Sequence, residues 1–178
     1  MILAHNELIY LLDSGVIENG QHSAVGGASI DIHLGDTILI EADTEHVADY
    51  RERTALKMRE VKLTPDGYVM RPGEFILAHC VEYLRMPLNL TALLRTKSSM
   101  GRIGFEHMDA GVVDPGFHGQ LTLEFKNQLQ HQSFRIRPGD PVGQLVFFRH
   151  ETVAHDNSYL AKGRYNGQRG VNQTRPNP

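Results

Sequence analysis

The feature of this chain that most constrains its fold is a succession of short apolar or alternating runs, which begins near Ala28 and is repeatedly broken by turn residues. Residues 30–34 alternate between apolar and polar side chains, and residues 75–81 form a mostly apolar run. Short runs of these kinds are typical of β-strands. Many short strands with little helix predict a mainly β fold, either a sandwich or a distorted β-barrel of the jelly-roll kind.

One helix is expected before the strands begin. Asn6 is suited to cap a helix, and Gly15 is suited to end it. Apolar residues recur between them at helical spacing, and these are Leu8, Ile9, Leu11 and Leu12. The sequence therefore predicts a short amphipathic N-terminal helix, and we expect any further helices to be few and short.

Two turns share one pattern, Arg-Pro-Gly followed by an acidic residue, at residues 71–74 and 137–140. Such turns commonly join neighbouring strands. The second one separates the run 134–136 from the run 142–148. We therefore expect these two runs to form an antiparallel pair.

The length of 178 residues, with 40% hydrophobic content, suits one core and is short for two domains. We expect a single domain over residues 1–178. The stretch 41–60 is charged and weakly patterned, which predicts a surface excursion. From Ala161 the composition turns to glycine, arginine, asparagine, glutamine and proline, which predicts a flexible tail over residues 161–178.

Composition argues against several classes of partner. The net charge of −3, from 18 basic and 21 acidic residues, gives no basic stripe for a nucleic acid. No stretch suits a membrane span or signal peptide, so we expect no membrane partner and cytoplasmic residence. Cys80 is the single cysteine, and the ten histidines lack His-Glu-x-x-His spacing. These counts argue against a protein-held zinc ion.

The segment 95–102, Arg-Thr-Lys-Ser-Ser-Met-Gly-Arg, places two hydroxyls between cations. On a short helix, Ser98 and Arg102 would share a face because they are four residues apart. Hydroxyl donors, a guanidinium and free N–H groups at a helix start suit phosphate oxygens. The alternative is a solvated, serine-capped helix end.

Two carboxylates are candidates for chemistry. Asp114 precedes Pro-Gly, so it is either a turn former or a group that accepts a sugar hydroxyl or orients a water. Glu124 lies in the alternating run 120–127, on the face opposite to the leucines. It is either a solvent-facing or ion-paired side chain, or, in a partly closed pocket, a proton shuttle whose pKa desolvation raises.

The tail segment 163–170 combines cations, one aromatic ring and hinge glycines. It could fold over a triphosphate. The alternative is a disordered polar terminus.

Taken together and in order, these segments resemble the dCTP deaminase family, which shares its fold with the trimeric dUTPases. The resemblance extends from the N-terminal helix to about Arg175. One departure is His33, which stands where the family usually has arginine. The matching motifs are residues 28–35, 71–75, 97–102, 111–117, 121–125, 143–147 and 164–168.

The resemblance implies a homotrimer with a dUTPase-like fold, active sites between neighbouring copies, and Mg²⁺ carried on the triphosphate. Glu124 would be the catalytic acid and base, the backbone at Ala110 would position base and water, and Asp114 would hold the 3′-hydroxyl. The remaining residues implied to contact the nucleotide are Lys97, Ser98, Ser99, Arg102, Asp109, Val113, Gln144, Arg164, Tyr165 and Gln168.

Two of these positions depart from the family pattern. Lys97 stands where arginine is common, which keeps the charge and loses a bidentate fork. Asp109 stands where threonine is frequent, close to the base and water. Its carboxylate would compete for the proton, repel the triphosphate or recognise an altered cytosine, so Asp109 is the expected site of divergent specificity.

Several activities fit the resemblance. The first interpretation is deamination of dCTP to dUTP, because trimeric dUTPases generally lack a glutamate at the position of Glu124. The run 110–114 instead resembles that of bifunctional enzymes that proceed to dUMP, which is the main alternative. A dUTPase alone and a non-catalytic nucleotide-binding protein stay open. The family also suggests dTTP as a feedback inhibitor.

Overall fold

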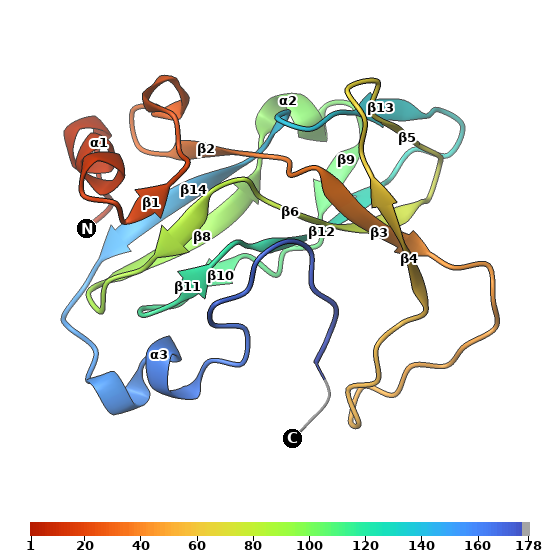
Figure 1. Cartoon of the computed structure of the whole chain (residues 1–178). Helices are drawn as coiled ribbons and strands as arrows, with labels where there is room; N and C mark the ends of the chain where they lie inside the picture. Colours follow the sequence, from red (N-terminus) through yellow and green to blue (C-terminus); the bar gives the residue numbers. More distant parts are fainter. Residues whose placement is uncertain (176–178) are drawn as a thin grey trace.

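The protein is described by a computed structural model over residues 1–175 (Figure 1). Strands dominate, and the helices are short, as the sequence predicts. In chain order the elements are α1 (His5–Asp13), β1 (Ile17–Glu18), η1 (His22–Ala24), β2 (Ile30–His33), β3 (Thr37–Glu41), β4 (Met58–Lys62), β5 (Tyr68–Met70), β6 (Phe75–His79), β7 (Tyr83–Arg85), β8 (Leu90–Thr96), α2 (Ser98–Gly101), β9 (Phe105–His107), β10 (Val112–Val113), β11 (His118–Gly119), β12 (Thr122–Asn127), β13 (Phe134–Ile136), β14 (Pro141–Arg149), η2 (His155–Asn157) and α3 (Tyr159–Lys162).

These strands form four sheets over the described residues. The largest has the order β4-β3-β6-β12-β9, and a second has the order β10-β8-β14-β2. Two smaller sheets have the orders β1-β7-β11 and β13-β5. The mainly β prediction is confirmed, but over residues 1–175 the sheets are not closed into a barrel. The chain passes from one sheet to another at its turns, so no continuous ladder of hydrogen bonds runs around the molecule.

The Arg-Pro-Gly turns show this transfer. The predicted antiparallel pairing of residues 134–136 with residues 142–148 is wrong, because β13 pairs with β5 whereas β14 pairs with β2 and β8. The turn after β13 is held by Leu34, whose N–H donates to Asp140 O and whose carbonyl accepts from Gly139 N. The earlier turn likewise carries the chain from β5 to β6. Both turns therefore connect different sheets.

The N-terminal helix forms, but it begins earlier than expected. Its N-cap is Ala4, so the prediction of Asn6 as the cap is wrong. The Glu7 carboxylate accepts a hydrogen bond from the Ala4 N–H at 3.3 Å. A side chain of the first turn thus satisfies a backbone N–H group at the start of the helix. Gly15 follows the helix at a φ of 74°, as its predicted role as a stop requires. Leu8 and Leu11 face the core.

One cluster of buried apolar residues includes side chains from both large sheets. The Phe105 and Phe125 rings lie 4.2 Å apart, centroid to centroid, and Phe134 packs edge-on against Phe105 at 5.4 Å. Strand β2 alternates between buried and half-buried residues, and β12 does the same. This alternation leaves one face of β12 free of the core, and that face carries Glu124.

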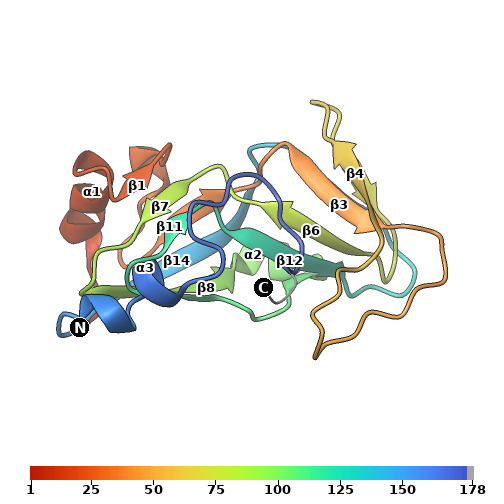
Figure 2. The ribbon, with the colours of Figure 1, turned by 60° about the horizontal axis from the view of Figure 1, so that its bottom comes forward.

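Two segments without regular strands lie over this free face. The loop between β3 and β4, residues 42–57, is largely exposed, and it is shorter than the predicted excursion 41–60 because β4 already begins at Met58. The C-terminal segment passes across β11 and β12 in both views of the ribbon (Figures 1 and 2). Within residues 1–175, no helix has the length and apolar character needed to cross a membrane.

Candidate active site

Glu124 lies near the middle of β12, directly across from Leu77 on β6. Strand alternation buries its neighbours Leu123 and Phe125 and turns the Glu124 side chain to the opposite face. The side chain keeps 29% of its exposed area. Among the described residues, Glu124 Oε2 is buried without a hydrogen-bond partner. The carboxylate side chain is therefore partly accessible, although its Oε2 atom is buried.

His107 lies beside this carboxylate. Its Nε2 atom is 3.2 Å from Glu124 Oε2, although the orientation of the two groups does not meet hydrogen-bond geometry. The imidazole is almost fully buried and packs edge-on against Phe125, with ring centroids 5.6 Å apart. Sequence reasoning missed His107, yet strands β9 and β12 pair so that it lies opposite Phe125, next to Glu124. It can fix the position of the carboxylate.

The segment from Ala110 to Asp114 forms a second wall. Gly111 packs against β8, where an added Cβ would lie 2.6 Å from Leu94 O. The Leu94 N–H also donates to the Gly111 carbonyl at 2.7 Å. Val113 is buried and pairs with β8, while the Asp114 carbonyl accepts from Phe117 N in the turn that follows. Glycine at position 111 is thus required for the close approach that places Ala110 and Asp114.

The C-terminal segment forms a third wall, and we call residues 164–175 the strap. Gln168 makes a parallel bridge with Gly119, and its Nε2 donates to Gln120 O at 2.7 Å. Gln168 Oε1 is buried and, among the described residues, has no hydrogen-bond partner. The Tyr165 N–H donates to the Tyr159 hydroxyl at 3.3 Å. Burial raises the pKa of Tyr159 above its usual value, with the Tyr165 contact opposing that shift.

These walls enclose a pocket of about 420 Å³. Six of the predicted site residues line it, namely Ala110, Val113, Asp114, Glu124, Tyr165 and Gln168. Glu124 and Asp114 are the two carboxylates among its described lining residues. Arg164 lies at a neighbouring surface cavity, where its guanidinium donates to Arg175 O at 3.0 Å. The pocket therefore brings together the residues predicted for the base and sugar.

The predicted phosphate residues lie elsewhere. Ser98 begins α2 and Arg102 ends it, with the Arg102 N–H donating to Ser98 O at 3.2 Å, so the predicted short helix forms. Lys97 is the N-cap residue, so the alternative of a serine-capped helix does not apply. Ser98, Ser99 and Arg102 are all exposed. In residues 1–175 of one chain, none of the three lines the pocket.

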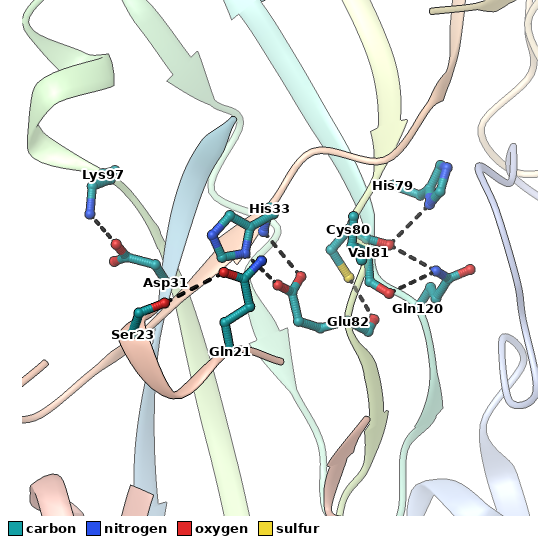
Figure 3. Close-up of polar contacts among 10 residues, drawn as sticks. All are labelled: Gln21, Ser23, Asp31, His33, His79, Cys80, Val81, Glu82, Lys97 and Gln120. Atoms are coloured by element: carbon teal, nitrogen blue, oxygen red, sulfur yellow. Dashed lines mark hydrogen bonds and ion pairs between the residues drawn. The ribbon is translucent and has the colours of Figure 1, made fainter. Parts of the chain in front are cut away.

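Lys97 and Gln144 share one partner. The Lys97 ammonium forms an ion pair with the Asp31 carboxylate, and Gln144 Nε2 donates to Asp31 Oδ1 at 3.0 Å (Figure 3 shows the Lys97 contact). Asp31 thereby ties β2 to β14 and to the residue before α2. Neither Lys97 nor Gln144 lines the pocket in the described chain. Their predicted phosphate role stays a prediction.

Asp109 is turned away from the pocket. Its carboxylate forms an ion pair with Arg95, and both side chains are more than half exposed. Asp109 also adopts a left-handed backbone conformation, with φ of 56°, immediately before Ala110. Its predicted role in specificity is untested, and its position ties the mouth of the pocket to β8.

Sequence reasoning missed one end of the pocket. Four apolar side chains from β4, β6 and the preceding loop line it, together with three strap residues, and these are Leu56, Met58, Phe75, Leu77, Asn172, Gln173 and Thr174. Phe75 and Leu77 are alternate residues of β6, so they share a face of that strand. Nothing in the sequence indicated that the loop and the strap would meet over that face.

The described residues contain no group of three or more His, Cys, Asp or Glu side chains arranged to hold a metal ion. Mg²⁺ commonly keeps several waters and binds through one or two carboxylates together with substrate phosphates. Glu124 and Asp114, the two carboxylates among the described lining residues, fit such an ion. The expectation that zinc is not used stays a prediction.

Comparisons with known proteins identify the fold and the family. The chain is similar to the crystal structure of 2′-deoxycytidine 5′-triphosphate deaminase from Agrobacterium tumefaciens, with a TM-score of 0.68 and 21% identity. The match covers 86% of this chain and 49% of that one, so this chain spans about half the length of that relative. The family model described as dCTP deaminase-like matches residues 2–150. The chain belongs to the dCTP deaminase-like family and is an enzyme, as the resemblance implied.

Curated relatives support the same family. A protein of Persephonella marina is 38% identical over 149 residues, which are 83% of this chain and 81% of the relative. A protein of Kocuria rhizophila is 35% identical over 183 aligned residues, covering 98% and 94% of the two chains. A third, from Mycobacterium bovis, is 31% identical and covers 98% and 95%. All three are named "dCTP deaminase, dUMP-forming".

Proposed function

We propose that this enzyme converts dCTP to dUMP, by deaminating the cytosine base and then releasing pyrophosphate from the dUTP that results. The observation that carries the proposal is the pocket in which Glu124 and Asp114 are brought together with Ala110, Tyr165 and Gln168. The names of the relatives support the dUMP-forming activity. Our first interpretation of the sequence, a reaction that stops at dUTP, is less well supported than this alternative.

In the deamination step, Glu124 acts as the general base and then the general acid. It takes a proton from a water molecule, whose oxygen forms a bond to C4 of cytosine, and passes that proton to N3. It then moves the proton of the new hydroxyl to the exocyclic nitrogen, the C4–N bond breaks, and ammonia leaves as the C4 carbonyl forms. The Glu124 side chain lines the pocket and keeps 29% of its exposed area, and this partial exposure supports the role.

His107 supports this role as a positioning residue. A glutamate on an open strand face samples several rotamers, and each rotamer that misplaces its oxygen slows proton transfer. The buried imidazole beside Glu124 Oε2 limits this freedom. The Ala110 backbone would position the base and water from the facing wall, and Asp114 would accept the 3′-hydroxyl of the sugar.

The second step adds water to the α-phosphorus of dUTP and breaks its bond to the bridging oxygen, which leaves with the pyrophosphate. For both steps to follow a single binding event, the nucleotide must stay bound after ammonia has left. The strap supports that retention, because Gln168 and Tyr165 join it to β11 and α3 over the same pocket.

The triphosphate is proposed to be held by a neighbouring copy in a homotrimer. Ser98, Ser99 and Arg102 are exposed and lie outside the pocket of their own chain, so they are available to the pocket of another. Exposed hydroxyls, the N–H groups at the start of α2 and a guanidinium suit phosphate oxygens. Lys97 and Gln144 lie beside this segment on Asp31.

Mg²⁺ is proposed to enter with the triphosphate. When bound, it would neutralise phosphate charge and orient the oxygens for attack. Asp114, an exposed carboxylate that lines the pocket, would help to hold such an ion.

The experiment is to incubate the purified protein with Mg²⁺ and either dCTP or dUTP, and to resolve nucleotides while assaying ammonia and pyrophosphate. We expect dCTP to give dUMP, ammonia and pyrophosphate, and dUTP to give dUMP and pyrophosphate. Accumulation of dUTP from dCTP, with added dUTP untouched, would restrict the enzyme to deamination. Light scattering should give three times the chain mass of 20.0 kDa.

Three expectations are untested and are retained as predictions. They are feedback inhibition by dTTP, cytoplasmic residence, and closure of the tail over the nucleotide. The last three residues of the predicted tail, 176–178, lie outside the described residues.

A further inference from the structure

The strap follows the chain from β11 to the start of β12 in a parallel direction. Gln168 bridges Gly119, the Gly170 N–H donates to Gln120 Oε1 at 2.8 Å, and the Asn172 N–H donates to Thr122 Oγ1 at 3.2 Å. The strap from Gln168 to Asn172 thus follows the chain from Gly119 to Thr122 in the same direction. The next strap residue, Gln173, directly follows the residue that is bonded to Thr122, and Thr122 is two residues from Glu124 on β12.

Strand alternation places Thr122 and Glu124 on the same face of β12, and both line the pocket. Gln173 also lines it, from the strap above. Gln173 and Glu124 therefore line the same pocket.

The strap is held on both sides of Gln173. On one side Asn172 is fixed to Thr122, and its Nδ2 donates to Arg169 O at 3.2 Å and to Gly170 O at 3.1 Å. On the other side Arg175 donates to Arg164 O at 2.9 Å, and its guanidinium lies over the Tyr165 ring. A residue between two such anchors has a restricted position over the pocket.

The Gln173 carboxamide has an unused acceptor. Its Oε1 atom is buried and has no hydrogen-bond partner among the described residues. The side chains that line the pocket are mostly apolar, with Leu56, Met58, Phe75 and Leu77 among them. A buried acceptor without a partner is unfavourable, so a ligand that donates to it gains affinity.

We propose that Gln173 is a specificity-determining residue that recognises the substituent at position 4 of the pyrimidine base. The proposal rests on the proposed function, which places that position at Glu124. A carboxamide offers an acceptor to the amino group of cytosine and, after rotation, a donor to the carbonyl oxygen of uracil. One side chain can therefore hold the base before and after deamination, so that dUTP stays bound for the second step.

The test compares three ligands in the intact enzyme carrying Gln173→Met, which removes both polar atoms and keeps an unbranched side chain. The kcat/KM for ammonia release from dCTP and for pyrophosphate release from dUTP should each fall about 3- to 10-fold. The inhibition constant of the 2-pyrimidinone deoxynucleoside triphosphate, which lacks a substituent at position 4, should stay unchanged. Gln132→Met makes the same change at an exposed residue and should alter none of the three values.

Two results would overturn the assignment of Gln173 and leave the proposed function intact. One is unchanged kcat/KM for both substrates, and the other is an equal loss of all three ligands, which would mean that the residue only holds the strap. A second variant, Gln173→Glu, keeps an acceptor and removes the donor, so it should impair dUTP more than dCTP, and the reverse order would contradict the inference. If the unmodified protein releases neither ammonia nor pyrophosphate, the proposed function fails, and the inference fails with it.

Discussion

The pocket around Glu124 and the segment around α2 differ in how one chain builds them. The pocket is enclosed by strands, a loop and the strap of the same chain, with Glu124 and Asp114 on its walls. Ser98, Ser99 and Arg102, by contrast, are exposed and outside that pocket. One region holds groups suited to proton transfer, and the other holds groups suited to phosphate.

The groups proposed for proton transfer and the groups proposed for phosphate binding therefore lie in separate regions of the chain. A carboxylate that exchanges protons benefits from partial desolvation, whereas cations that bind a triphosphate must stay accessible until the ligand arrives. If both regions serve one nucleotide, substitutions in the pocket should lower kcat, and substitutions at α2 should lower affinity. Four substitutions test this division, in order of decreasing expected effect.

Glu124→Gln should give the largest effect. The amide keeps the shape of the side chain and cannot accept or return the proton, so ammonia release from dCTP should fall by about 10²- to 10⁴-fold. Affinity for dCTP, measured by calorimetry, should be largely unchanged. Glu106→Gln is the matched control, because Glu106 is an exposed glutamate on the adjacent strand β9. Ammonia release near the parent rate would remove Glu124 from its role.

Arg102→Ala should act on affinity instead. Loss of a charge-assisted hydrogen bond to phosphate should weaken dCTP binding by about 10- to 100-fold, with a smaller change in kcat. Affinity for deoxycytidine, which has no phosphate, should be unaffected. Arg137→Ala removes an exposed arginine from a turn and serves as the control. Equal weakening for deoxycytidine and dCTP would contradict the phosphate assignment and the division between the two regions.

His107→Phe should give a moderate effect confined to the pocket. The phenyl ring can keep the packing against Phe125, while the contact with Glu124 Oε2 is lost. We expect kcat to fall by about 3- to 10-fold with KM unchanged, because the carboxylate is less well positioned. His107→Gln, which retains a polar group near Glu124, should recover part of kcat. A change in melting temperature with no change in kcat would assign His107 to packing alone.

Local patterns predicted the strands better than their partners. The alternation in residues 30–34 and 120–127 was confirmed in β2 and β12, because each strand buries one face. The pairing expected across the turn 137–140 was wrong, because two strands that follow each other in the sequence can belong to different sheets, as β13 and β14 do. Which strands pair depends on packing between segments that are distant in the sequence, and a local pattern carries no information about that packing.

The same limit applies to the site. Alternation placed Glu124 on the face of its strand that points away from the core, but it left open whether that face is exposed to solvent or lines a pocket. The answer depends on the loop that brings Leu56 and on the strap that brings Gln173, segments about 50 or more residues from Glu124 in the sequence. His107 was missed because its contact with Glu124 arises from the pairing of β9 with β12.

The smallest effect is expected at the edge of the pocket, where the backbone of His118 accepts from Gly167 N and donates to Asn166 Oδ1. Burial, with a contribution from Arg85, lowers the pKa of His118 below its usual value of 6.5. The neutral imidazole is therefore favoured in the folded state.

Above pH 6.5 the imidazole is neutral in both the folded and the unfolded protein, so the lowered pKa does not affect stability. As the pH falls below 6.5, the unfolded protein takes up the proton first, and the folded protein loses stability until the pH passes the lowered pKa. His118→Asn removes this titration and keeps the backbone contacts with the strap. Melting temperatures measured from neutral to mildly acidic pH should fall less in the variant, by a difference on the order of 1 °C. The same acid-dependent fall in both proteins would show that His118 does not couple protonation to the strap, and the edge of the pocket would then respond to pH no differently from the exposed α2 segment.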